Sequence, residues 1–308
     1  MKEIPQRGGN FAEDTEAMLM TSRRSRSGYA VAGRNLAAVV LIVAVAMLIC
    51  CSRPQLDARQ SQATVDAVAK VLHRHGSLLE ASRQLPRMPG TDRTLALRQL
   101  ADAKDILALL PRLEMEPGYA LDYVYQRDEL GGRPILYSRA IQVAPFASYA
   151  AMTNSMSGVE WNRRCWESWG SQFYSERLRC DGSTEGFFQF IVLHLMGDQF
   201  FHLWHDAYHD EIIICEKSGI DALLQDVGNP GGIGVGDRMT QGTRLAAYAL
   251  DLMPRVVVKV KTVEVSVVIF TKWDGFERRS YNISRAFPHR LLGETRTKLV
   301  DFSIGYVM

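Results

Sequence analysis

The sequence lacks the short motifs that identify several common enzyme classes. It contains neither the G-x-S-x-G run of serine hydrolases nor the S-x-x-K run of penicillin-binding proteins. Acidic residues are frequent, but the sequence does not show which two of them could form a catalytic pair. A glycosidase site is therefore neither indicated nor excluded. These motifs therefore identify no catalytic set of nucleophile, base and metal ligands in the sequence.

The chain also lacks an excess of one charge. Its formal net charge is +2, and its first 34 residues hold six basic and four acidic side chains, which leaves 30 of each sign in the remainder. A neutral body lacks the basic surface that binding to a phosphate backbone requires. We therefore expect no nucleic-acid partner.

Charge is entirely absent from Leu36–Cys51, which reads LAAVVLIVAVAMLICC. A helix of a soluble core would show polar residues at every third or fourth position, and this run shows none. Its length approaches the roughly 20 residues that a helix needs to cross a bilayer. The sequence predicts a transmembrane anchor that contacts membrane lipid over residues 36–51. The side chains expected in lipid include Leu36, Val40, Ile42, Val45 and Leu48.

The flanking charges predict the orientation of this anchor. Four arginines stand between residues 23 and 34, whereas only Arg53 and Arg59 follow the run closely. The positive-inside rule then places the N-terminus in the cytoplasm and residues 53–308 outside it, in the periplasm if the cell is bacterial. Two other fates of the segment stay open: removal as a signal peptide, or lipidation of Cys51 after processing.

The rest of the N-terminal half divides by composition. Residues 1–33 are polar and aperiodic and predict a disordered cytoplasmic tail, followed by the anchor at 34–52 and a linker at 53–62. Apolar residues at helical spacing predict a helical hairpin over 63–112, with a break at residues 84–90. We expect this hairpin to pack on the following domain, and a partner-binding coiled coil is the alternative.

Residues 117–308 predict an antiparallel α+β domain, because the apolar pattern changes to a period of two. Asp274-Gly275 predicts a tight hairpin turn. Short helices are expected at residues 219–225 and 240–252. The expected strands are 119–125, 135–143, 187–195, 199–205, 211–215, 255–270 with a bulge or bend at Thr262, 277–284 and 298–306.

A histidine-rich segment is the strongest candidate for chemistry. The run HDAYH from His205 to His209 resembles the H-E-x-x-H zinc site of metallopeptidases, in which a helix places two histidines beside a general-base Glu. Asp206 replaces that Glu, and His202 would share the face as a third ligand if the segment were helical. A strand over 199–205 would instead point His202 and His205 to opposite faces, away from a common metal ion. We therefore predict no cofactor and keep zinc as the alternative.

Two further segments admit a binding role. Trp161, Trp166 and Trp169 lie close together in the sequence, and they suit either stacking on a carbohydrate or covering the core of a sheet, which is commoner. Residues 229–237 form a Gly-rich loop before a predicted helix, but no Lys-Ser or Lys-Thr follows to complete a phosphate site. We interpret this loop as a connector.

Cysteine is scarce, with five residues in the chain. Cys165, Cys180 and Cys215 belong to the predicted outer domain, where an oxidising compartment would join two of them and leave one thiol. Three single pairings are possible. Cys165–Cys180 is the local pairing and the one we favour.

These observations favour a single-pass membrane protein whose outer α+β domain binds or scaffolds a protein or glycan partner without catalysis. One alternative is a membrane-tethered metal-dependent hydrolase that uses His205 and His209 with Asp206. Another is a sugar-binding module that uses the three tryptophans.

Overall fold

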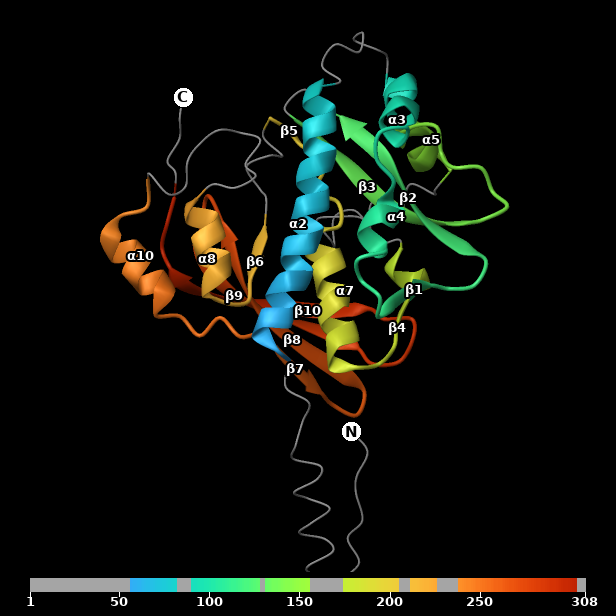
Figure 1. The fold of residues 1–308 in the computed structure, drawn as a ribbon. Helices are drawn as coiled ribbons and strands as arrows, with labels where there is room; N and C mark the ends of the chain where they lie inside the picture. The colour runs from blue at the N-terminus through green and yellow to red at the C-terminus, as the bar shows by residue number, and fades with distance from the viewer. Residues whose placement is uncertain are drawn as a thin grey trace, which may run out of the picture. The chain divides into compact units, whose positions relative to one another are not determined.

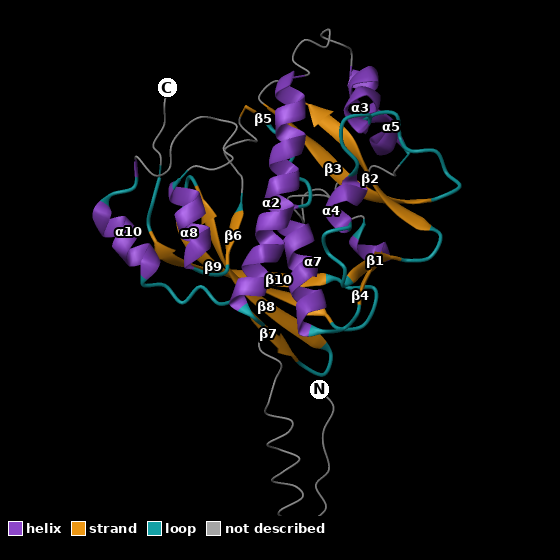
Figure 2. Cartoon of the chain, in the orientation of Figure 1, coloured by secondary structure: helices purple, strands orange, loops and turns teal. Residues whose placement is uncertain are grey.

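The computed structural model describes residues 56–81, 90–127, 131–155, 174–204, 211–225 and 238–303 (Figure 1). All of them belong to the second of the chain's two compact units, Pro54–Met308. Figure 2 shows helices and antiparallel sheets in this unit, which confirms the α+β class. The predicted tail and anchor lie outside the described residues. Within those residues, no helix is long and apolar enough to span a membrane.

The first described helix, α2 (Ala58–Ala81), begins inside the segment that we expected to be a linker. The Asp57 carboxylate accepts a hydrogen bond of 2.9 Å from the backbone N–H of Gln60, which satisfies a donor of the first turn. Val65 and Val68 are buried on the inner side of the helix. The linker prediction was therefore wrong for the residues after Asp57, because a cap and a buried face start the helix there.

The expected second helix of the hairpin is two shorter helices, α3 (Gly90–Arg98) and α4 (Ala103–Leu107). Asp102 separates them, because its side chain accepts a 2.9 Å hydrogen bond from the Lys104 N–H and starts α4 as an N-cap. Both helices contact strand β2 (Tyr119–Arg127), and α4 also contacts α2. The segment therefore packs into the domain and forms no separate coiled coil within the described residues.

The predicted hairpin after residue 117 is confirmed. Strand β2 pairs in antiparallel register with β3 (Gly131–Ala140), so that Tyr123 lies opposite Leu136. The remaining small elements of this part are β1 (Leu113–Met115), α5 (Tyr149–Asn154), η2 (Ser175–Arg177), β4 (Leu178–Cys180) and β5 (Leu203–Trp204). Strand β5 extends the hairpin beside β3, and β1 pairs with β4 in a sheet of its own.

Residues 187–195, which we expected to form a strand, belong to helix α7 (Thr184–Met196). This run is apolar at almost every position, so it shows neither a period of two nor one of 3.6. The start of the helix decides the matter, because the Ser183 hydroxyl accepts a 2.9 Å hydrogen bond from the Gly186 N–H as an N-cap. The expected meander over residues 187–215 was therefore wrong.

The main sheet has the strand order β10-β9-β8-β6, and β7 also pairs with β8. The Asp274-Gly275 turn between β8 and β9 is confirmed, with Gly275 at a φ of 77°. The strands are β6 (Ile212–Ile214), β7 (Arg255–Val258), β8 (Thr262–Thr271), β9 (Gly275–Ser284) and β10 (Leu291–Val300).

Two predictions for this sheet were wrong. The segment 255–270, expected to be a single strand, forms the hairpin β7–β8. In this hairpin Val258 pairs with Val263, and the Lys259 N–H donates a 2.8 Å hydrogen bond to the Thr262 carbonyl. Of the bulge or bend expected at Thr262, the bulge is absent, and the change of parity marks a tight turn in which the chain reverses. The last described strand spans 291–300 and begins seven residues before the expected 298–306, of which residues 304–306 lie outside the described residues; an exposed, charged edge strand carries no apolar alternation by which to predict it.

Helices cover both faces of the main sheet. On one face, α7 and α2 share a core with Val263 and Val265 of β8. On the other face, α8 (Lys217–Leu224) and α10 (Gln241–Tyr248) pack with Phe270 and the rest of a second core. These two helices confirm the short helices predicted from the sequence, and Figure 1 shows α8 beside β6 and α10 on the other side of α8.

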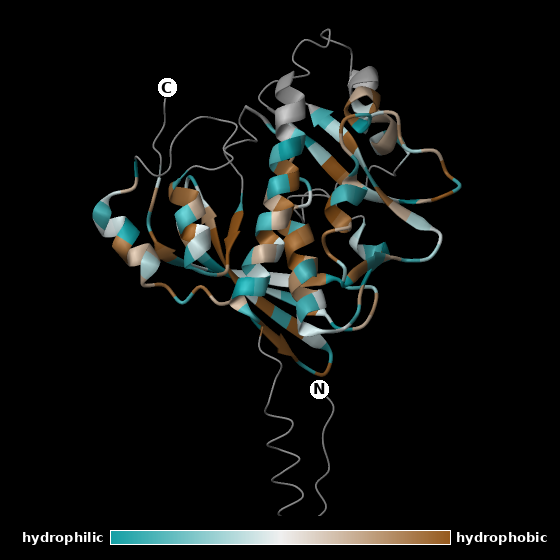
Figure 3. Cartoon of the chain, viewed as in Figure 1, coloured by the Kyte–Doolittle hydropathy of each residue, from teal (hydrophilic) through white to brown (hydrophobic). Residues whose placement is uncertain are grey.

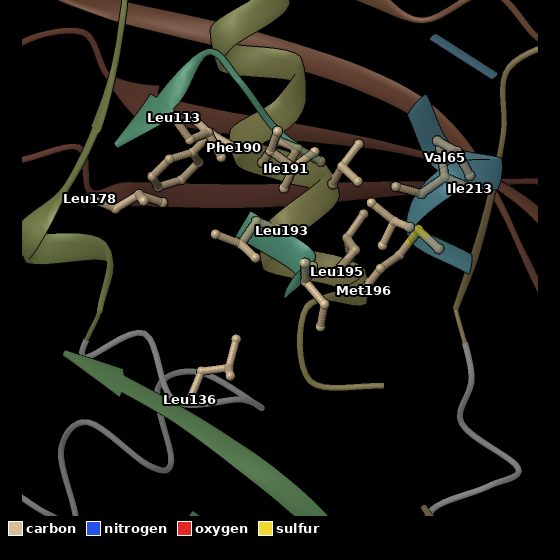
Figure 4. Packing of buried hydrophobic residues seen from close by; sticks show 14 of the residues in the cluster. Val65, Leu113, Leu136, Leu178, Phe190, Ile191, Leu193, Leu195, Met196 and Ile213 are labelled. Carbon is tan, nitrogen blue, oxygen red and sulfur yellow. The ribbon is translucent and has the colours of Figure 1, made fainter. Parts of the chain in front are cut away.

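The largest core surrounds α7. Figure 4 shows Leu193 of this helix between Leu113 and Leu178 on one side and Val65 and Ile213 on the other. Figure 3 colours β6 and β7 as mostly hydrophobic, since these short strands consist largely of isoleucine or valine. Packing from every side fixes α7 in place and with it the residues at its first turn.

Candidate functional site

A strand–turn–helix connection places Cys180 beside the first turn of α7. Strand β4 ends at Cys180, Gly182 turns the chain with a φ of 81°, and Ser183 caps the helix. A positive φ is one that glycine adopts without strain, which allows the strand to lead into the helix within three residues. The Cys180 side chain is partly exposed there.

His289 meets Cys180 from the loop between β9 and β10. Its Nε2 lies 3.3 Å from the Cys180 sulfur, and its Nδ1 lies 3.1 Å from the Ser284 carbonyl oxygen. Because a carbonyl can only accept, the proton of the neutral imidazole sits on Nδ1, and Nε2 is left to accept from the thiol. The loop thus fixes the tautomer that a base for this thiol would need.

Aromatic rings enclose this imidazole. The His289 side chain is only 4% exposed, and the centre of its ring lies 5.4 Å from that of Phe187 and 6.0 Å from those of Phe190 and Phe287. The Ser284 hydroxyl closes the loop by accepting from a backbone N–H at 2.7 Å. The ring therefore has little freedom to turn away from the thiol.

Burial sets the protonation of the pair. It raises the pKa of the Cys180 thiol and lowers the pKa of the His289 imidazole, so each shift favours the neutral form. At neutral pH the pair is therefore a thiol that donates to an imidazole. Such a pair can act as a nucleophile with its base, or it can simply satisfy two partly buried polar groups.

Arginines stacked on aromatic rings cover the outer side of β4. The Arg179 guanidinium carbon lies 4.7 Å from the centre of the Phe287 ring, and that of Arg177 lies 4.3 Å from the centre of Tyr119. Glu116 joins the two arginines, at 2.7 Å from Arg177 and 3.3 Å from Arg179, and these hydrogen bonds lower its pKa. We call these five residues the arginine–aromatic surface.

A second polar cluster lies on the main sheet around Arg279, which is 2% exposed. Its Nε lies 3.1 Å from Glu277 and 3.8 Å from Glu294, and its Nη1 forms a short ion pair with Glu211. Arg296 adds a bond of 2.6 Å to Glu294. Burial raises the pKa of Glu211 although Arg279 opposes that shift. The cluster balances a buried cation with three carboxylates.

His194 of α7 lies next to this cluster. The centre of its ring lies 5.7 Å from that of Tyr281 in an edge-to-face contact. Burial, assisted by the nearby Arg279 charge, lowers the pKa of His194 to about 4. The imidazole is therefore neutral at physiological pH.

The structure describes one member of the predicted zinc site. His202 follows a residue with a φ of 56° and has its Nε2 3.0 Å from the Asp198 carbonyl oxygen. The strand expected there is reduced to β5. His205, Asp206 and His209 lie outside the described residues. Among those that are described, no group of three potential ligands could hold a metal ion.

The other candidates from the sequence are placed only in part. Cys180 and Cys215 are free thiols in the structure, whereas Cys165 lies outside the described residues, and the Cys165–Cys180 pairing stays a prediction. The three tryptophans, the Gly-rich loop and the anchor residues also lie outside them. Cys51, the candidate for lipidation, also lies outside the described residues.

The sequence alone does not indicate His289 or the Arg279 cluster. Cys180 and His289 are 109 positions apart, and no spacing rule connects two residues at that separation. A weaker signal exists, because Cys180 stands three residues before the cap of a helix, but the apolar run of that helix predicts a strand. Arg279 stands in a predicted strand, where a charged residue suggests an exposed face.

Comparisons with known proteins add no relationship. No protein-family model matches the chain, and neither a curated protein nor a solved structure resembles it significantly.

Proposed function

We propose that this chain is a single-pass membrane protein whose α+β domain lies outside the cytoplasm and binds a protein or glycan partner. The uncharged run Leu36–Cys51 carries this proposal, because it suits a bilayer and lies two residues before the compact unit that begins at Pro54. The basic residues ahead of the run support the orientation.

The arginine–aromatic surface supports a binding role. Arginine and tyrosine dominate the residues that carry binding energy in protein interfaces, because they combine a large contact area with a polar group. The Arg177 and Arg179 side chains are 43% and 42% exposed, and stacking and Glu116 hold them in fixed positions. Side chains that are ordered before binding lose little entropy when a partner arrives.

The Arg279 cluster, in which Glu211 has a shifted pKa, also supports binding over catalysis. Arg279 and its carboxylates satisfy one another inside the fold, and the Arg279 side chain is buried beyond the reach of a substrate. Such networks shift pKa values without any catalytic purpose.

An alkaline wash of membranes tests the anchor. We expect the full chain to stay in the pellet, and we expect the variant carrying Val40→Asp and Val45→Asp to be released, because each carboxylate in the centre of the run costs about 2.5–3.5 kcal/mol of insertion. Release of the unmodified chain would contradict the proposal. Retention that depends on Cys51 would identify the lipidated form instead.

Photo-cross-linking tests the binding surface. Glu114 pairs with Arg179 across β1 and β4 and is exposed, so a photoreactive amino acid at position 114 reports on the arginine–aromatic surface. We expect one discrete product in intact membranes that disappears with Arg179→Ala. The same amino acid at exposed Leu245 is the control. Equal products at both positions would contradict a partner at this surface.

The metal-dependent hydrolase with His205, His209 and Asp206 remains the alternative. Elemental analysis of the untagged full chain decides between the two functions. Stoichiometric zinc that is lost in folded His205→Ala and His209→Ala variants would establish the alternative and contradict a non-catalytic domain. Zinc below stoichiometric levels would leave the binding proposal standing.

Thiol chemistry is a second candidate function, favoured by the 3.3 Å contact between the Cys180 sulfur and the His289 Nε2. If His289 serves as the base, His289→Gln should slow alkylation of Cys180 at neutral pH by about tenfold or more. Mass spectrometry can follow each site separately, and buried Cys215 is the internal control. An unchanged alkylation rate in the folded variant would mean that the contact between Cys180 and His289 is only a structural hydrogen bond.

A further inference from the structure

We propose that one end of the main sheet rests on the anionic lipid surface of the membrane that anchors the chain. This end comprises the β7–β8 turn (residues 259–261), the β9–β10 loop (residues 285–290) and Leu292, and we call it the sheet-end surface. The inference rests on the anchor of the proposed function. It adds a second contact with the membrane, made by the folded domain itself.

The strand register places these segments together. Thr262 pairs with Ser284 at the ends of β8 and β9, and Leu291 pairs with Ile283 where β10 begins. The Arg285 N–H also donates a 2.9 Å hydrogen bond to the Lys261 carbonyl, which joins the loop to the turn. The turn and the loop therefore form one continuous surface.

Exposed apolar side chains occur on this surface. Val260 at the tip of the turn is 88% exposed, Leu292 is 54% exposed and Phe287 is 37% exposed. An apolar side chain gains free energy when it leaves water, and a membrane interface is one place where a surface loop can bury it.

Basic side chains surround these apolar ones. The exposed cations are Lys259, Lys261, Arg285 and Arg290. Neither residues 252–263 nor residues 281–293 contain an acidic residue, although Glu264 pairs with Lys259 at 2.8 Å. A surface that combines lysine and arginine with exposed valine, leucine and phenylalanine matches the chemistry of anionic lipid headgroups above an acyl layer.

The chain enters the domain at the same end. Near the start of α2, the Gln60 amide donates to Glu185 in the first turn of α7 at 3.4 Å, and Phe187 of that turn contacts His289 in the β9–β10 loop. Figure 1 likewise shows the start of α2, the start of α7 and the β7–β8 hairpin at one end of the domain.

The short segment between the anchor and the domain favours the bilayer as the partner of the sheet-end surface. Four residues separate Cys51, the last residue of the uncharged run, from Leu56. Even a fully extended chain spans only about 18 Å over that interval. The bilayer is therefore the partner that is always within reach of this end, and its negative charge complements the surface.

Lipid cross-linking in liposomes tests the contact. A photoreactive amino acid replaces Val260 in the full chain, which is reconstituted into vesicles with 30% phosphatidylglycerol, and label transfer to phospholipid is measured. The same amino acid at Leu245 is the control, because α10 packs with Phe270 and Phe276 at the other end of β8 and β9. We expect about fivefold more lipid adduct at position 260, and equal yields would overturn the proposal.

Charge reversal tests the role of the cations. Lys261→Glu with Arg290→Glu should lower the yield at position 260 by about fivefold, to the level of the control at position 245, since each basic residue at an anionic surface contributes about fivefold. Lys70→Glu with Lys217→Glu makes the same change of charge at exposed positions of α2 and α8 and should leave the yield unchanged. An equal loss in both pairs would overturn the assignment to the sheet-end surface.

An alkaline wash of the same vesicles separates the two proposals. A chain that stays in the vesicles but gives no excess adduct at position 260 refutes the lipid contact and leaves the anchor intact. A chain that is washed off refutes the anchor, and the lipid contact with it.

Discussion

His194 makes the free energy of unfolding depend on pH. Its pKa is about 4 in the folded chain and 6.5 when it is exposed to water, so below pH 6.5 the unfolded chain binds more protons than the folded one. We expect stability to be complete above pH 6.5 and to fall by about 3 kcal/mol as the pH drops to 4.

Urea unfolding at several pH values measures this effect. In His194→Gln the decline between pH 6.5 and pH 4 should become shallower, because the variant has no group to protonate there. The matched control is His73→Gln on α2, in which the decline should keep its steepness. A decline of the same steepness in His194→Gln would contradict the assignment.

Arg279 holds three carboxylates in a partly buried site. In Arg279→Met the carboxylates lose their shared cation, and we expect a loss of about 3–5 kcal/mol at neutral pH. Arg296→Met removes a side chain that is 55% exposed and should cost less than about 1 kcal/mol. Chemical unfolding of both variants gives the comparison, and similar losses would mean that the cluster is less buried than its geometry indicates.

At the scale of single elements, the N-cap of α7 controls more than its own helix. Ser183→Ala removes the acceptor for the Gly186 N–H and should cost about 1 kcal/mol, whereas Ser183→Asn keeps an acceptor and should cost little. Because Cys180 stands three residues earlier, we also expect faster alkylation of its thiol in Ser183→Ala. Thermal unfolding with mass spectrometry measures both, and an unchanged stability would show that the cap is dispensable.

The β8–β9 turn depends on glycine for two reasons. Gly275 has a φ of 77°, and a Cβ there would approach the Phe302 nitrogen to 2.6 Å. Gly118 has a φ of 87° with open space around it. We expect Gly275→Ala to destabilise the chain by about 2–3 kcal/mol and Gly118→Ala by about 1 kcal/mol, as the second carries only the backbone strain. Equal losses in urea unfolding would contradict the steric part.

Elements with local signals could be predicted from the sequence. The Asp274-Gly275 turn and the β2–β3 hairpin were found, because alternation and turn chemistry act between neighbouring residues. Helix α7 was mistaken for a strand, because every side of it is buried and the apolar pattern has no period. The sequence predicts only a bulge or bend where the β7–β8 turn lies, because three residues with two lysines carry no usual turn signal.

At the scale of the whole molecule, the α+β class could be predicted because apolar residues follow a helical period in some segments and a period of two in others. The Cys180–His289 site could not be predicted in this way. The contact between Cys180 and His289 joins β4 to the β9–β10 loop, and it exists only because α7 packs between β1, β4 and the main sheet. The sheet-end surface likewise depends on register between distant strands. Such arrangements follow from tertiary packing, which a single sequence does not display.

Protease protection in sealed right-side-out vesicles tests whether the α+β domain lies outside the cytoplasm. Epitopes are added before Met1 and after Met308, and protease is added to the outside. We expect the C-terminal epitope to be lost and the N-terminal epitope to survive until detergent opens the vesicles. Survival of the C-terminal epitope with loss of the N-terminal one would place residues 53–308 in the cytoplasm and would overturn the proposed orientation.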